Sequence, residues 1–111
     1  MTVIAVVGSL NVDLVSVVSR NPAAGETITS ESFVTRCGGK GANQAVAAAR
    51  LAGKQASIEM TGAVGDDEFG TRLKTGLAGS GVHVDSVRTV NGMNSGVAVI
   101  LVCHAGAVFP T

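Results

Sequence analysis

Aromatic residues, cysteine and net charge are all scarce in this chain, and each scarcity excludes a class of function. The chain has no tryptophan or tyrosine and only three phenylalanines, which argues against base stacking on single-stranded nucleic acid. Eight basic and eight acidic residues cancel, so no basic surface for DNA, RNA or an anionic membrane is expected. No apolar run reaches the length of a membrane span. We therefore expect no nucleic-acid partner and no membrane partner.

The two cysteines, Cys37 and Cys103, are too few for a metal site or a disulfide framework. We expect free thiols in a reducing compartment. His83 and His104 have no partner at ligand spacing, so no metal-binding residue is predicted. The apolar N-terminus lacks a preceding basic segment, so a strand is predicted there instead of a signal peptide. The cytosol is the expected location by default, with the nucleus as a second option for a eukaryotic protein.

Glycine and small apolar residues are abundant. The 111 residues include 15 glycines, and 46% of the residues are apolar while 14% are charged. This composition is typical of a globular protein with one core and many tight turns. One domain is expected, because the sequence shows neither a linker nor an internal repeat.

The densest glycine stretch is CGGKGANQ at residues 37–44. Such a loop can bring its backbone close to a neighbour because no Cβ intervenes. The alanine-rich segment at about residues 42–51 is predicted to be a helix, and a helix N-terminus favours oxygen-rich ligands. Lys40 and Asn43 add a cation and an amide, so the stretch predicts a site for a phosphorylated or polyhydroxy small molecule. A plain crossover helix is the structural alternative.

A second polar group follows the first predicted strand, Val3 to Val7. This apolar run does not alternate, which is typical of a central strand of a parallel sheet that is buried on both faces. Asn11 and Asp13 follow its carboxyl end, where open α/β sheets bind ligands. In an extended chain the two side chains point the same way and can bind neighbouring hydroxyls. A turn with Asx capping is an equally good interpretation.

The remaining pattern predicts an α/β fold with an extra small β-layer. Strands are expected at residues 14–18, 27–35 (as a pair), 55–61, 82–90 and 97–102, and a second helix at 68–78. Asp66 or Asp67 can cap that helix, and we prefer this structural role to a catalytic one. The sheet has few strands, and its last strong strand is followed by almost nothing. We therefore interpret the chain as the first part of a larger domain.

Three known site motifs do not occur. A Walker A loop would need a glycine where Val34 stands and a serine or threonine where Gly41 follows Lys40. The dinucleotide fingerprint GxGxxG does not follow the first strand. No nucleophilic serine lies in a GxSxG elbow.

Three other stretches together resemble the ribokinase group of the PfkB carbohydrate kinase family. They are GSLNVD at residues 8–13, GGKGANQA at residues 38–45 and GAVGDDEFG at residues 62–70, in the family's order and at its spacing. Each stretch alone is a weak signal, and the three together are a strong one. The 1-phosphofructokinase-like members share the GGKG loop but usually end their first strand with Asn-Pro, so the start of this chain favours ribokinase.

The resemblance covers about residues 3–102 and implies a three-layer αβα ribokinase-like sheet, incomplete here, with a small β-lid. Residues 1–111 would be the N-terminal part of the kinase domain, without its ATP-binding half. The implied activity is ATP-dependent phosphorylation of D-ribose to ribose 5-phosphate, with Mg²⁺ and a monovalent cation, K⁺, as further cofactors. Their sites would lie outside this chain. Because phosphoryl transfer depends on positioning and electrostatics, the chain alone is expected to be inactive.

The resemblance also implies roles for individual residues. Five residues would bind the sugar: Asn11, Asp13, Gly39, Lys40 and Asn43. The loop would also act as a hinge, and two further glycines would belong to this hinge: Gly38 and Gly41. The strands around residues 14–36 and 96–103 would form a lid that excludes water on closing and, in many ribokinases, a clasp for a homodimer.

The chain departs from the family pattern in two places. The family's catalytic base is an aspartate in a later Gly-Ala-Gly-Asp motif. Residues 62–66 resemble that motif but have one residue too many, so Asp66 is not assigned as the base and no catalytic residue is expected here. Residues 103–111 are atypical, and a truncation, a splice variant or a frame error would each explain them.

Three alternatives to a ribokinase fragment stay open. The chain could be a non-catalytic sugar-binding or lid-dimerising module. It could derive from a kinase for another sugar or a nucleoside. It could also be unstable by itself, because the strand Val97–Val102 would then be an unpaired edge prone to aggregation.

Overall fold

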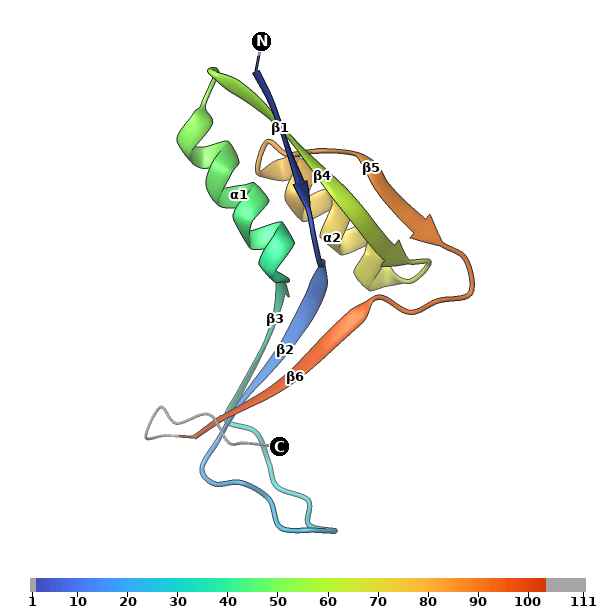
Figure 1. The fold of residues 1–111 in the computed structure, drawn as a ribbon. Coiled ribbons are helices and arrows are strands. Elements are labelled where there is room, and N and C mark those ends of the chain that lie inside the picture. Colours follow the sequence, from blue (N-terminus) through green and yellow to red (C-terminus); the bar gives the residue numbers. More distant parts are fainter. Residues whose placement is uncertain (1, 104–111) are drawn as a thin grey trace. The chain divides into compact units, whose positions relative to one another are not determined.

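The computed structural model describes residues 2–103, which form six strands and two helices (Figure 1). The elements are β1 (Thr2–Val7), β2 (Asn11–Val18), β3 (Ser32–Gly38), α1 (Lys40–Ala52), β4 (Ala56–Gly65), α2 (Glu68–Gly79), β5 (His83–Val90) and β6 (Gly96–Cys103). The expectations for His104 and for the atypical tail to Thr111 lie outside the described residues. The predicted α/β class is confirmed.

The chain divides into two compact units, each with its own sheet. The first unit comprises residues 1–12 and 37–96, and its three-stranded sheet has the order β1-β4-β5 with parallel pairing. Among the described residues, the second unit comprises residues 13–36 and 97–103, and its three-stranded sheet has the order β3-β2-β6. The expectation of a small β-layer outside the main sheet is therefore confirmed.

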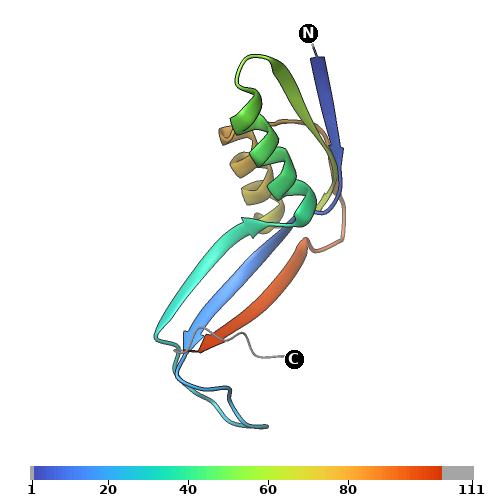
Figure 2. The ribbon, with the colours of Figure 1, turned by 60° about the vertical axis from the view of Figure 1, so that its left-hand side comes forward.

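Both helices of the first unit lie on the same face of its sheet (Figures 1 and 2). The core below them includes Ile58 and Met60 of β4, which are buried and, being two residues apart, point to the same face. From α2 come Leu73 and Leu77, which are four residues apart and therefore share one side of the helix. The contribution of α1 includes Ala45, whose small side chain is completely buried and lets the helix approach the sheet closely.

β4 is longer than its sequence predicted. The strand was expected to end at Thr61, but it continues to Gly65, and residues 62–65 are not part of a loop. Its last four residues pair with β5, from Gly62 opposite Val87 to Gly65 opposite Val90. A glycine-containing stretch has weak strand propensity, so this pairing with a distant segment decides its conformation.

β1 is not the buried central strand that its apolar run predicted. It stands at the end of the sheet order and pairs with β4. Val3, Ile4 and Val7 are 56%, 43% and 78% exposed. A continuous apolar run indicates that a strand is suited to burial on both faces. Whether it is buried depends on other segments of the fold, which the strand's own sequence does not specify.

In the second unit, residues 27–35 do not form the predicted pair of strands. β3 begins only at Ser32, and its neighbour in the sheet is β2. The segment before β3 is held by one local hydrogen bond, from the Ser30 hydroxyl to the Ser32 carbonyl at 2.6 Å, and by one backbone bond to β2, from the Glu31 amide to the Val17 carbonyl at 2.8 Å. Serine side chains can bond the nearby backbone in this way, which competes with regular strand pairing.

The thiols of Cys37 and Cys103 are free, as expected. Among residues 2–103, no helix is long and apolar enough to cross a membrane. Within the same range, no three side chains of histidine, cysteine, aspartate or glutamate gather in a way that could hold a metal ion.

Candidate functional site

The glycine loop between β3 and α1 packs directly on the backbone that leaves β1. A Cβ atom at Gly39 would lie 2.5 Å from the Ser9 carbonyl oxygen and 2.9 Å from the Leu10 Cα. A Cβ atom at Gly41 would lie 2.7 Å from the Gly8 Cα. Gly39 also has a φ of 99°, at which any side chain would be strained. Only glycine fits these two positions, and the two segments touch because of it.

α1 begins at this contact. The Ala42 amide donates to the Ser9 carbonyl at 3.0 Å, and the Asn43 amide donates to the Gly39 carbonyl at 2.9 Å. Gly39 is the N-cap residue and has no side chain that could accept from the first turn, which also contains no acidic residue. The positive end of the helix dipole is therefore not neutralised by the helix's own side chains, which favours an electron-rich ligand there.

Four of the five residues predicted to bind a sugar lie in the first unit. Asn11 is half-buried at the start of β2, and Gly39 contacts the backbone that leads into it. Lys40 and Asn43 are exposed in the first turn of α1. Asp13 is half-buried and belongs to the second unit. The structure thus joins the glycine loop to the Asn11 segment, while Asp13 is not part of the same unit.

Asn11 and Asp13 both lie in β2. The extended conformation is therefore confirmed, and the alternative of a turn at these residues is wrong. In a strand, residues two apart face the same side. An amide and a carboxylate placed in this way can act as donor and acceptor toward neighbouring hydroxyl groups.

Asp67 has the structural role that the sequence favoured. Its carboxylate caps α2 by accepting from the Gly70 amide at 2.8 Å. It also accepts from the Ser95 amide at 2.8 Å and from the Ser95 hydroxyl at 2.7 Å. The hydrogen bonds from Ser95, followed by the one from Gly70, lower the pKa of the Asp67 carboxyl below its ordinary value.

Asp66 and Ser95 complete this arrangement. The Asp66 carboxylate accepts from the Gly92 amide at 2.8 Å. The buried Ser95 hydroxyl accepts from the Gly65 amide at 2.9 Å while it donates to Asp67. Sequence reasoning missed Ser95, whose only signal was a polar residue directly before the glycine that starts β6. These groups hold the end of β4, the start of α2 and the turn before β6 together.

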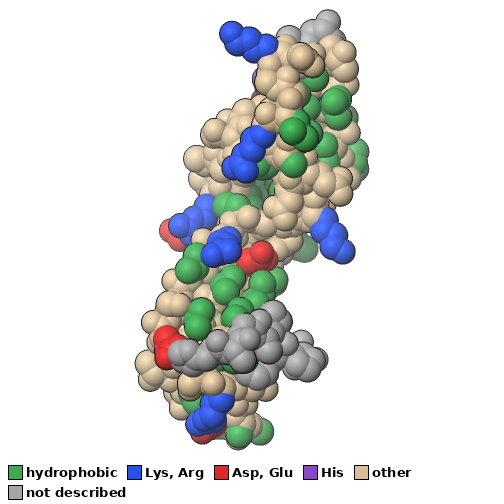
Figure 3. All heavy atoms as spheres, turned by 90° about the vertical axis from the view of Figure 1, so that its left-hand side faces the viewer, with side chains coloured by type: hydrophobic (Ala, Val, Ile, Leu, Met, Phe, Trp, Pro, Cys, Tyr) green, Lys and Arg blue, Asp and Glu red, His purple; other side chains and the backbone are tan. Residues whose placement is uncertain are grey.

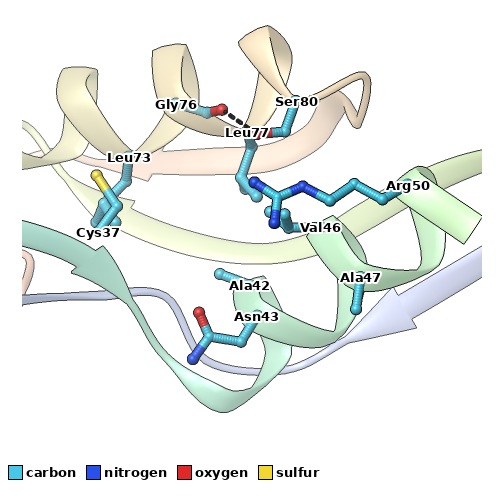
Figure 4. A pocket seen from close by; sticks show the side chains of 10 residues that line it. All are labelled: Cys37, Ala42, Asn43, Val46, Ala47, Arg50, Leu73, Gly76, Leu77 and Ser80. Carbon is cyan, nitrogen blue, oxygen red and sulfur yellow. Dashed lines mark hydrogen bonds between the residues drawn. The ribbon is translucent and has the colours of Figure 1, made fainter.

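A cavity of about 380 Å³, which the sequence did not predict, lies between α1 and α2 (Figure 4). Its walls include Val46 from α1 with Leu73 and Leu77 from α2, and Asn43 lines one end. The Arg50 side chain extends from α1 toward Leu77 (Figure 4). The space depends on how two helices pack, so a pattern read along one segment could not reveal it.

Comparison with known proteins gives a consistent result. The profile of the pfkB family carbohydrate kinases matches residues 1–108. A ribokinase from Schizosaccharomyces pombe is 47% identical over 106 residues, which make up 93% of this chain and 33% of that protein. A deoxyribokinase from Salmonella typhimurium is 44% identical over 99 residues, which make up 89% of this chain and 31% of that protein.

A solved structure is similar over nearly the whole chain. The structure of Arabidopsis thaliana ribokinase complexed with ribose and ATP superposes with a TM-score of 0.86 at 37% identity, covering 97% of this chain and 34% of that one. This likeness confirms the predicted ribokinase-like sheet. The chain spans about a third of the length of the curated relatives that it matches.

Proposed function

Because this chain belongs to the pfkB family of carbohydrate kinases, we propose that it carries the sugar-binding side of a ribokinase. The reaction would join the 5-hydroxyl oxygen of D-ribose to the γ-phosphorus of ATP and break the bond to the β-phosphate oxygen, giving ribose 5-phosphate, ADP and a proton. The observation that carries this proposal is the contact of Gly39 with Ser9 and Leu10. It joins two of the three motifs by which the sequence resembles ribokinases.

Each polar residue would have a defined task at the sugar. The Asn11 amide and the Asp13 carboxylate would bind adjacent hydroxyls, since they follow one another on the same side of β2. Lys40 would supply a cationic donor and Asn43 an amide, both from the first turn of α1. Gly39 would contribute its backbone to the sugar site, because its missing Cβ lets the glycine loop lie against Ser9 and Leu10.

The second unit would act as a lid. Closure over the sugar would exclude water, which otherwise competes as the phosphoryl acceptor. Of the two glycines expected at the hinge, Gly38 at the end of β3 would allow the movement, whereas Gly41 lies in the first turn of α1 and packs on Gly8, which does not suit a hinge. Apolar side chains of the second unit are exposed, among them Phe33 and Val99, and a homodimer formed through the lid would cover them.

ATP, Mg²⁺ and K⁺ are implied as cofactors by the family. The ATP would supply the phosphoryl group, and the cations would neutralise its charge. The described residues contain no acidic cluster that fits a metal ion, so none is assigned to Mg²⁺ or K⁺ and no step is derived through them. We accordingly assign no catalytic residue, and we expect the 111-residue chain alone to be inactive and cytosolic.

A second sugar deserves a test alongside ribose. The deoxyribokinase from Salmonella typhimurium is nearly as similar to this chain as the fission yeast ribokinase is, at 44% against 47% identity. A site for 2-deoxyribose would differ from a ribose site only in the partner of one hydroxyl. Sites that hydrogen-bond a hydroxyl discriminate strongly against its absence, because a buried polar group is then left unpaired.

A chimeric enzyme tests the function directly. Residues 3–102 would replace the matched third of Schizosaccharomyces pombe ribokinase, and ADP release would be followed with ribose and with 2-deoxyribose. We expect ATP-dependent turnover of ribose and at least about a tenfold loss of kcat/KM in Asp13→Ala, since a hydrogen bond to a charged group is lost. Asp85→Ala, which removes an exposed carboxylate of β5, serves as the matched control.

The outcomes are distinct. A folded chimera without ribose turnover would contradict the proposal, and a strong preference for 2-deoxyribose would assign the site to that sugar instead. If Asp13→Ala and Asp85→Ala behave alike, the assignment of Asp13 is wrong. Calorimetry of the 111-residue chain with ribose asks separately whether this part binds sugar on its own.

A further inference from the structure

The cavity of about 380 Å³ between α1 and α2, called here the α1–α2 cavity, has an apolar wall on each helix. Val46 comes from α1, and Leu73 and Leu77 come from α2 (Figure 4). All the residues that line it belong to the first unit. Small-molecule sites in proteins are concave, mostly apolar and about 300–1,000 Å³ in volume, and many lie between helices. The α1–α2 cavity has these properties.

A glycine in α2 keeps this cavity open. Gly76 lines it, and a Cβ atom at this position would lie 3.6 Å from the Cys37 Sγ, which is an ordinary contact distance. Gly76 does not have a positive φ either. Neither a close contact nor the backbone conformation therefore requires glycine here. Because glycine within a helix costs stability relative to alanine, the open space is kept at the expense of helix stability.

Arg50 is the only charged residue among the described residues that line the cavity. Its side chain extends from α1 toward Leu77 of α2 (Figure 4). Within the part of the chain that the structure describes, its guanidinium forms no ion pair with a carboxylate. A guanidinium presents its N–H donors in a planar fork that matches the two oxygens of a carboxylate. The cavity thus combines apolar walls with a cation that no lining residue neutralises.

The segment that contains α1 is also basic as a whole. Residues 37–58 contain no aspartate or glutamate and three basic residues, Lys40, Arg50 and Lys54. Figure 3 faces the α1 side of the first unit, where basic side chains lie next to hydrophobic ones. Because no carboxylate of this segment offsets these charges, an anion is attracted to this side of the unit.

We propose that the α1–α2 cavity binds a small organic molecule that has an apolar body and one carboxylate. The body would lie against Val46, Leu73 and Leu77. The carboxylate would accept two parallel hydrogen bonds from the Arg50 guanidinium. Apolar walls favour a hydrophobic body, and the single cation favours one negative charge.

This site adjoins the proposed sugar site but is separate from it. Asn43 lines one end of the cavity and lies in the first turn of α1, whereas Arg50 lies in the last turn. At 1.5 Å per residue, the two are about 10 Å apart along the helix axis. The carboxylate would therefore lie away from the glycine loop. The proposal does not rest on the proposed ribokinase activity.

A purely structural role for Arg50 is the main alternative. A basic residue in the last turn of a helix is favoured by the helix dipole. A long aliphatic stem can also cover apolar surface while its charged end stays in water. Both effects would place a cation here without any ligand, so the experiments must separate affinity for a ligand from stability of the helix.

Two matched probes test the chemistry of the ligand. 3-Phenylpropanoate and 3-phenylpropanamide share the same apolar body, and only the first is charged. In calorimetry with the 111-residue chain, the carboxylate should bind at least about tenfold more tightly, since charge-assisted hydrogen bonds are stronger than neutral ones. Changes in amide NMR shifts should cluster at residues 46–50 and 73–80. Equal affinity of the two probes, no saturable binding, or changes confined to residues 38–43 would overturn the proposal.

Substitution of Arg50 separates the two roles. Arg50→Gln removes the charge and should weaken 3-phenylpropanoate binding at least about tenfold while binding of 3-phenylpropanamide is unchanged. Lys54→Gln makes the same change of charge at a residue that does not line the cavity, and it should leave both affinities unchanged. Equal losses in the two variants would reveal a general charge effect and contradict the site. Lower thermal stability of Arg50→Gln without a loss of affinity would assign Arg50 the structural role instead.

Filling the cavity is an independent test. Gly76→Leu should abolish binding of both probes, because its side chain would occupy the space. Gly79→Leu adds the same side chain to α2 at a position with no atom within 4 Å of the Cβ, and binding should persist. Undiminished binding in Gly76→Leu would place the probe elsewhere and overturn the proposal. If circular dichroism shows that Gly76→Leu is unfolded, the comparison of Arg50→Gln with Lys54→Gln decides. None of these measurements involves ribose or ATP, so their outcome is independent of whether the chimera phosphorylates ribose.

Discussion

The Ser95 hydroxyl donates a hydrogen bond of 2.7 Å to the Asp67 carboxylate and accepts one of 2.9 Å from the Gly65 amide. Ser95 is 6% exposed; the bond from the Gly65 amide is buried, and the bond to Asp67 is partly buried. They tie the N-cap of α2 to a residue 28 positions later in the chain. The first unit thus stabilises its glycine-rich corner with one buried hydroxyl and one carboxylate.

Removing either partner should destabilise the first unit. Ser95→Ala leaves the Gly65 amide without its acceptor, at a cost of about 1–3 kcal/mol. Asp67→Ala removes the side chain that caps α2 and should also destabilise the unit. Urea denaturation of both single variants and the double variant should give a double-variant cost smaller than the sum, since the two residues share a bond. If the double-variant cost equals the sum of the two single-variant costs, the hydrogen bond between Ser95 and Asp67 contributes nothing to stability.

The lowered pKa of Asp67 predicts a pH dependence. Its folded-state pKa lies below its unfolded-state value, so as the pH falls the unfolded state takes up the proton first. The stabilisation is therefore present above the ordinary carboxyl pKa of about 4 and is lost as the pH falls through the folded-state pKa. The stability difference between the wild-type chain and Asp67→Asn should shrink from about pH 6 to about pH 3. A constant difference would contradict this.

In the second unit, Arg20 and Glu26 form a two-pronged ion pair, with nitrogen–oxygen distances of 2.5 Å and 2.7 Å. The hydrogen bond from Arg20, then the one from the Ala23 amide at 3.0 Å, lower the pKa of Glu26 to about 2. Lysine cannot form the same planar fork. NMR titration of Arg20→Lys should show a higher Glu26 pKa than in the wild-type chain. An unchanged value would mean that the fork does not form in solution.

Two glycine-to-alanine substitutions in helices should act in opposite directions. Gly41→Ala pushes a methyl group into the backbone of Gly8, where 2.7 Å is available, and overpacking of this kind costs about 1–3 kcal/mol. Gly79→Ala meets no atom within 4 Å and should be neutral or stabilise the chain by up to about 1 kcal/mol, because alanine favours helix. Thermal denaturation of both variants measures the contrast. A harmless Gly41→Ala would contradict the close contact at the glycine loop.

Some of the site was predictable from local patterns. The glycine loop and the alanine-rich stretch after it predicted a loop feeding a helix, and α1 begins at Lys40. The Asp67 cap was predictable because capping depends on residues within one turn. Ser95 was not, since its importance comes from Gly65 and Asp67, which are far from it in the chain. The sugar-binding roles of Asn11, Asp13, Gly39, Lys40 and Asn43 remain predictions.

The sequence by itself determined the α/β class, the helix boundaries set by an aspartate cap and by Gly53, and membership of the pfkB family. These follow from signals carried within short stretches. Only the tertiary structure decided that β1 stands at an edge, that β4 continues to Gly65, and that Gly41 touches Gly8. Each of these depends on contacts between segments that are far apart in the sequence. The pattern of either segment alone does not predict the free energy of such a contact.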